Sequence, residues 1–137
     1  MKRLARFRFA WLAMALAMPL LTSCKDDGIV GTYSATTFTY APAGSAPTDV
    51  LAAGGSISLV IARNLSTSGS IQIPASVTGS SAFSASLLGT AAQNGNTVTL
   101  NLVADTFLRD MPLTFDGSSL SGTSIISGTT IVVTLSK

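Results

Sequence analysis

The chain has 137 residues, of which eight are Lys or Arg and six are Asp or Glu, and its formal net charge is +2 at pH 7. Four of the basic residues lie within the first eight positions, so the rest is slightly acidic and offers no clustered basic face for a nucleic acid. The sequence has no His and one Cys, which excludes a Ser-His-Asp triad, an imidazole-bound metal site and a disulfide within the chain.

The first residues combine a positively charged start with a short apolar run. Residues 1–8 carry the basic side chains, and residues 9–21 are apolar. A membrane-spanning helix needs about 20 apolar residues, and Pro19 would interrupt the end of this run. The segment therefore predicts a secretory signal peptide rather than a transmembrane anchor.

Leu21-Thr22-Ser23-Cys24 follows the apolar run directly. This tetrapeptide resembles the lipobox of bacterial lipoproteins: a branched apolar residue, two small residues and an obligatory cysteine. The resemblance implies a signal peptide at 1–23, cleavage before Cys24, and acyl chains such as palmitate on Cys24 that hold the protein on a membrane of the cell envelope. Because Lys25 rather than Asp follows, it also implies the periplasmic face of the outer membrane if the source is Gram-negative. The alternative is an ordinary signal peptide cut elsewhere, with an incidental cysteine.

Residues 24–29 are predicted to form a short lipidated tether, and residues 30–137 to form one domain. From Val30 onward the apolar residues recur with a period of two, as in Thr97–Leu102, where Val, Leu and Leu alternate with Thr and Asn. This alternation is typical of half-buried strands. Asn94-Gly95 and Asp116-Gly117 are hairpin signals between such segments.

These patterns predict about eight strands and a long surface loop at 41–55. The predicted strands are 31–40, 56–63, 68–74, 82–89, 96–103, 106–111, 112–116 with 119–126, and 130–136. Successive short strands joined by tight turns imply an all-β fold, an antiparallel up-and-down β-barrel that closes to hide its edges. A barrel of this size either fills its interior with side chains or holds one small ligand.

Gly31-Thr32-Tyr33 opens the first predicted strand, and residues 130–136 form the last. These features resemble lipocalin-like, calycin-type barrels, which often begin with a Gly-x-aromatic motif. Many of these barrels place a late Arg across the open end against the first-strand aromatic, and Arg109 lies in a corresponding segment, Phe107–Met111. The resemblance thus implies a ligand-binding barrel in which Tyr33 and Arg109 are candidate site residues.

Three roles remain open for Arg109. It could close the barrel over Tyr33 through a cation–π contact, it could bind an anionic ligand at the mouth, or it could face outward and pair with a neighbouring carboxylate. The aromatic side chains could either line a pocket or belong to the core. These residues are Tyr33, Phe38, Tyr40, Phe83, Phe107 and Phe115.

No catalytic set is recognisable. There is no Glu, and turn capping and solvation explain each Asp. We find no phosphate-binding glycine loop, no calcium loop and no metal or cofactor site. The sequence therefore predicts a membrane-anchored, non-enzymatic envelope lipoprotein whose barrel binds a small apolar ligand or acts as an interaction module with an envelope protein. The alternative is a periplasmic inhibitor of a secreted protease, with residues 25–29 as its inserting arm.

Overall fold

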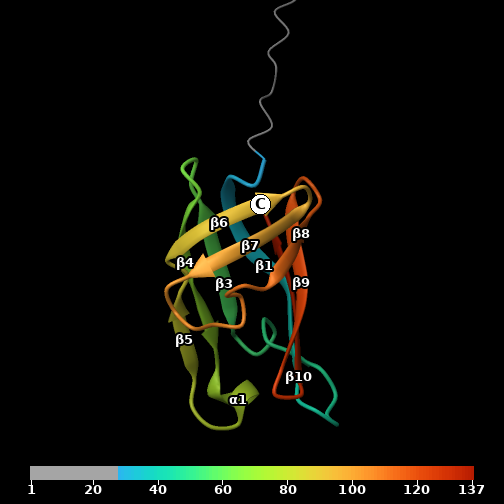
Figure 1. The fold of residues 1–137 in the computed structure, drawn as a ribbon. Coiled ribbons are helices and arrows are strands. Elements are labelled where there is room, and N and C mark those ends of the chain that lie inside the picture. The colour runs from blue at the N-terminus through green and yellow to red at the C-terminus, as the bar shows by residue number, and fades with distance from the viewer. Residues whose placement is uncertain (1–27) are drawn as a thin grey trace, which may run out of the picture.

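Eight antiparallel strands close into a barrel in the computed structural model, which describes residues 28–137 (Figure 1). The strands follow one another around the wall, and β10 pairs back onto β1. In chain order they are β1 (Gly31–Ala41), β3 (Ser56–Ile61), β4 (Ser66–Ile73), β6 (Gly89–Asn94), β7 (Thr97–Leu102), β8 (Pro112–Phe115), β9 (Ser119–Ile126) and β10 (Thr129–Ser136). The predicted all-β, antiparallel up-and-down barrel is therefore confirmed.

Three short elements accompany the barrel. The strand β2 (Thr48–Asp49) pairs with the end of β1 and lies within the predicted 41–55 loop. The strand β5 (Phe83–Ser86) pairs with β4, and the helix α1 (Ala75–Thr78) connects these two strands. All three lie in the half of the barrel away from Lys137, whose position is marked C in Figure 1.

The two predicted hairpins are present, and their turns explain why. Asn94 pairs with Thr97 across Gly95, which adopts a φ of 60° that glycine tolerates at no steric cost. Phe115 pairs with Leu120, and the Asp116 carboxylate accepts hydrogen bonds from the backbone N–H groups of Ser118 (2.9 Å) and Ser119 (2.7 Å). These bonds, with those from the two serine hydroxyls, hold the pKa of Asp116 at about 2.

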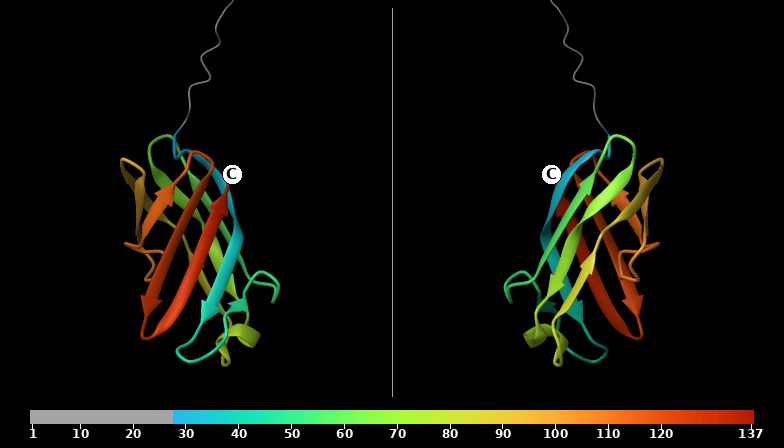
Figure 2. Two further views of the ribbon diagram at one scale, coloured as in Figure 1. Left: turned by 90° about the vertical axis from the view of Figure 1, so that its right-hand side faces the viewer. Right: turned by 90° about the vertical axis from the view of Figure 1, so that its left-hand side faces the viewer.

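The interior of the barrel is packed along most of its length. The alternation seen in the sequence fixes which side chains point inward, so Val98, Leu100 and Leu102 of β7 are all buried. Facing strands contribute Leu59, Ile71, Leu120, Val133 and others to the same core. Figure 2 shows the strands inclined to the barrel axis on both sides, the arrangement that lets inward side chains fill the centre.

Two strand predictions were wrong. Residues 106–111 form a turn-rich connection, because their buried residues (Thr106, Phe107, Leu108 and Met111) do not alternate with exposed ones and Asp110 adopts a φ of 58°. The predicted strand 82–89 ends at Ser86, and a new strand, β6, begins at Gly89. The strand 89–94 was missed because its polar residues hide the alternation.

The predicted signal peptide (1–23) and Cys24 lie outside the described residues. Within residues 28–137 no helix has the length and apolar character needed to cross a membrane.

Candidate functional site

The two ends of the barrel differ. We call the end marked C in Figure 1, where Lys137 contacts Gly28 and Tyr33, the proximal end. The end that contains α1 and the β9–β10 hairpin is the distal end. The described residues begin with Gly28, at the proximal end.

At the distal end, the strands of residues 28–137 are not all joined to their neighbours by hydrogen bonds. β8 pairs with β9 only as far as Ser121, after which β9 continues to Ile126 alongside β10 alone. Across this gap, β5 pairs only with β4. The connection between β7 and β8, residues 103–111, lies over the gap (Figure 1) and buries Phe107, Leu108 and Met111 against the core.

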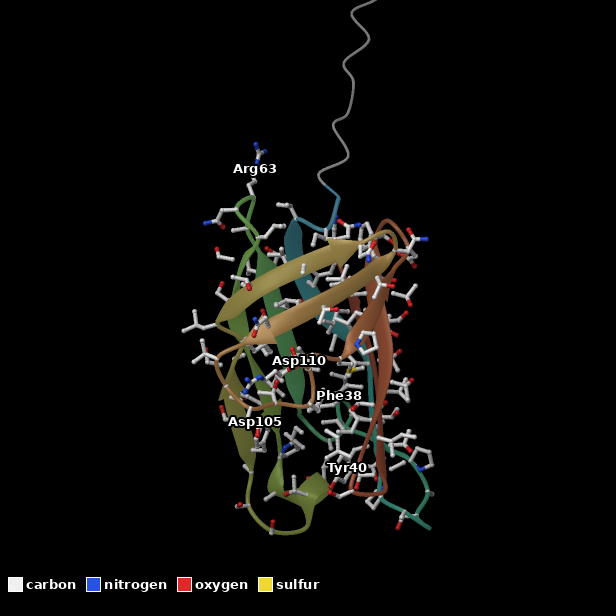
Figure 3. All side chains as sticks on the ribbon, in the orientation of Figure 1. Phe38, Tyr40, Arg63, Asp105 and Asp110 are labelled. Carbon is white, nitrogen blue, oxygen red and sulfur yellow. The ribbon has the colours of Figure 1, made fainter. Side chains whose placement is uncertain are left out.

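A cavity of about 380 Å³ lies under this connection. Its volume falls within the range of small-molecule sites, about 300–1,000 Å³. It is lined by Tyr40, Ile73, Thr78, Phe83, Asp105, Thr106, Phe107, Ile126, Ser127, Thr129 and Ile131. Figure 3 shows Tyr40 and Asp105 in the distal half of the barrel, far from Arg63 at the proximal end.

The floor of the cavity is apolar and continuous with the core. Ile73 and Ile131 are almost fully buried, and the Phe107 ring lies 5.6 Å, centroid to centroid, from the ring of the core residue Phe38. Phe83 and Ile126 are 36% and 46% exposed. Large apolar side chains at this level of exposure mark a rim that an apolar molecule could cover.

Among the polar residues of the lining, Thr106 and Asp105 differ in burial, and neither side chain has a hydrogen-bonding partner within residues 28–137. The Thr106 hydroxyl is buried and makes no hydrogen bond, an arrangement that costs about 1–3 kcal/mol. The exposed Asp105 carboxylate is engaged in no hydrogen bond or ion pair. By contrast, Thr67, a buried threonine on β4, donates to the carbonyl oxygen of Leu87 at 2.8 Å.

The sequence-predicted site residue Tyr33 lies at the other end of the molecule. It is fully buried, and its hydroxyl donates to the carbonyl oxygen of Ile29 at 2.8 Å. Burial raises the pKa of Tyr33 to about 12. Tyr33 is not among the residues that line the distal cavity.

The cation over Tyr33 is Lys137, and not Arg109, for which this contact was one of three open roles. The Lys137 Nζ lies 5.6 Å from the centre of the Tyr33 ring and 5.2 Å from that of Phe115, and it donates to the carbonyl oxygen of Gly28 at 2.6 Å. The end of β10 lies beside the start of β1, so a residue directly after β10 reaches this position.

Arg109 instead lies in the connection between β7 and β8. Its side chain is 42% exposed, and its Nε lies 3.7 Å from Oδ2 of Asp110. Of the three roles left open by the sequence, this geometry matches the outward-facing residue paired with a neighbouring carboxylate. The structure therefore does not bring Tyr33 and Arg109 together.

The aromatic set divides between core and cavity. Tyr33 and Phe38 are core residues, Phe115 packs against the core, and Tyr40, Phe83 and Phe107 line the cavity. Asp105 and Thr106 were not predicted as site residues from the sequence. The two polar residues stand directly before apolar residues that do not alternate with polar ones. Such a sequence is typical of a loop that packs against a core.

The cavity has the volume and the largely apolar lining that suit a small molecule. Within residues 28–137, no cluster of three or more His, Cys, Asp or Glu side chains could hold a metal ion. No protein-family model matches the chain, and neither the curated proteins nor the solved structures yielded a match.

Proposed function

We propose that this protein is a lipid-anchored envelope lipoprotein whose barrel binds a small apolar molecule in the distal cavity. The anchor rests on the resemblance of residues 21–24 to a lipobox. The binding function rests on one observation, a cavity of about 380 Å³ that is apolar at its floor and at its rim. Because the buried residues of the described strands fill the centre, the ligand is expected to lie at the distal end.

The arrangement of the two ends supports the combination of anchor and cavity. The chain between Cys24 and the proximal end is only a few residues long. A lipid on Cys24 would therefore keep the proximal end near the membrane and leave the distal cavity on the opposite side, open to the surrounding space. A ligand could then enter without passing the membrane-facing end.

Native mass spectrometry of the full chain purified from its own host tests the binding function. We expect an additional mass that corresponds to a small apolar molecule and that is lost when Ile73, in the cavity floor, is changed to Asp. The matched control is Ser84→Asp on the exposed face of β5, which should retain the added mass. A folded protein with no bound molecule in any preparation would contradict the proposal.

Metabolic labelling with a palmitate analogue tests the anchor. Wild type and Ser23→Ala, which keeps a small residue before the cysteine, should both incorporate the label. Cys24→Ala should lose it and leave the membrane fraction, because the acyl chains supply the membrane affinity. Undiminished label in Cys24→Ala would contradict lipid attachment at this residue.

A second candidate function is an interaction module, and one surface favours it. Val103 is 82% exposed and Leu88 is 56% exposed, and the N–H of Val103 donates to the carbonyl oxygen of Leu88 at 2.9 Å, so the two apolar side chains are neighbours. The inhibitor alternative gains no such support. Ile29 is buried and Gly28 is bonded to Lys137, so this end of the proposed arm is held against the barrel.

A further inference from the structure

The charge in the lining of the distal cavity restricts which amphiphilic molecules can bind there. Asp105 is the one charged residue in its lining. The basic residues within residues 28–137 are Arg63, Arg109 and Lys137, and none of them lines the cavity. An anionic head group placed there would lie beside a carboxylate, and no basic side chain of residues 28–137 lines the cavity.

The rings around the cavity reinforce this preference. Tyr40, Phe83 and Phe107 all contribute to the lining. The face of an aromatic ring attracts a cation with a strength of about 0.5–1 kcal/mol at exposed sites. A carboxylate together with aromatic rings is a combination suited to an ammonium group.

The unpaired hydroxyl adds a second polar contact in the same wall. Thr106 follows Asp105 directly, and its buried hydroxyl has no partner within residues 28–137. Rotation about the Cα–Cβ bond can move the threonine hydroxyl to another staggered position. A bound molecule with a hydrogen-bonding group can thus gain a partner at little cost, because Thr106 gives up no existing hydrogen bond.

We propose that the distal cavity selects a small amphiphile with a protonated amine head group. This inference rests on the proposed ligand-binding function and names its ligand class. The apolar part of the molecule lies against Ile73, Phe107 and Ile131, and the ammonium group lies at the rim beside Asp105. Fatty acids and other anionic amphiphiles are disfavoured, and neutral alcohols bind with intermediate affinity.

Three ligands of equal chain length separate these cases. Hexylamine, hexanol and hexanoate are titrated at neutral pH and low salt into the purified full chain, with isoleucine methyl groups followed by NMR. The methyl groups of Ile73, Ile126 and Ile131 report on the cavity, and those of Ile29 and Ile61, which are buried but do not line it, serve as internal controls. We expect hexylamine to bind about fivefold more tightly than hexanol, because its ammonium group would form a partly exposed ion pair with Asp105. Hexanoate should bind most weakly, because its carboxylate would be repelled by that of Asp105.

Substitution of the carboxylate tests its role directly. In Asp105→Asn, the affinity for hexylamine should fall to that for hexanol, and the affinity for hexanol should not change. Asp110→Asn removes a carboxylate from the same connection but outside the lining, and it should preserve the preference for the amine. Added salt should weaken hexylamine binding to wild type and leave hexanol binding unchanged.

The outcomes separate this inference from the proposed function. Equal binding of the amine and the alcohol, or a preference for the amine that survives in Asp105→Asn, would overturn the inference while leaving an apolar ligand site. If none of the three ligands shifts the cavity methyl groups, the proposed ligand-binding function itself is contradicted.

Discussion

The proximal and distal ends of the barrel contain similar polar side chains that differ in whether they have partners among the described residues. At the proximal end the Tyr33 hydroxyl, the Thr67 hydroxyl and the Lys137 ammonium all have partners. At the distal end the Thr106 hydroxyl and the Asp105 carboxylate have none among the described residues, and Phe83 is partly exposed. The chain itself thus supplies the partners of these proximal groups, whereas at the distal end the buried Thr106 hydroxyl has no partner within residues 28–137.

The largest expected difference between the two ends concerns their tyrosines. Tyr33→Ala removes a fully buried ring and should lower the free energy of unfolding by about 3–5 kcal/mol. Tyr40→Ala, at a partly buried cavity residue, should cost less than half as much. Denaturant unfolding followed by circular dichroism measures both values. Equal losses would show that the distal end is packed as tightly as the proximal end.

Alkaline pH should weaken the proximal end selectively. The pKa of Tyr33 is raised from 10.0 to about 12, so its contribution is fully present below pH 10 and is lost as the pH rises through about 12. The loss is on the order of 2 kcal/mol. It should be absent in Tyr33→Phe when the unfolding free energies of both proteins are measured across this range. The phenolate absorbance of wild type should also include a late step that Tyr33→Phe lacks.

The two buried threonines should respond with opposite signs. Thr67→Val leaves the carbonyl oxygen of Leu87 unpaired and should destabilise the fold by about 1–2 kcal/mol, whereas Thr106→Val removes an unpaired hydroxyl and should stabilise it by about 1 kcal/mol. Thermal unfolding of both variants checks the signs. Destabilisation by Thr106→Val would mean that its hydroxyl already has a partner, and the contrast between the ends would be lost.

The smallest effect is expected for the charged residues. Lys137→Met keeps the aliphatic stem but loses the contacts with Tyr33, Phe115 and Gly28, and it should cost about 0.5–1 kcal/mol. Arg109→Met should change stability by only a few tenths of a kcal/mol, because its ion pair with Asp110 is exposed. A larger loss for Arg109→Met would restore a closing role for that residue. Both values come from the same denaturant titrations.

The fold was predictable from the sequence because local rules agree with the global structure. Alternation placed Val98, Leu100 and Leu102 in the core, and Asn94-Gly95 marked a hairpin. The cavity could not be predicted from such local rules. The run that begins at Thr106 is apolar enough to suggest a strand, but it folds over a gap in the wall, and only the tertiary structure shows that gap.

The partner of Tyr33 could not be predicted for a related reason. Arg109 was the cation considered for this contact, as one of three possible roles, because a family resemblance directed attention to a late arginine. Lys137 lies 104 positions from Tyr33 in the sequence, and no local pattern connects them. Closure of the barrel brings them together, and closure depends on how many strands the wall contains and on their register.

The pairing of β1 with β10 also sets the order of events in folding. Thr36 and Thr134, which are hydrogen-bonded across this seam, lie 98 positions apart. Hairpins such as β6–β7 can form early at small entropic cost, but the seam requires nearly the whole domain to be brought together first. Until residues 129–136 arrive, β1 has an open edge on which another copy of the chain could pair. The step that closes the wall is therefore expected to limit the rate of folding, and the chain is most exposed to aggregation just before it.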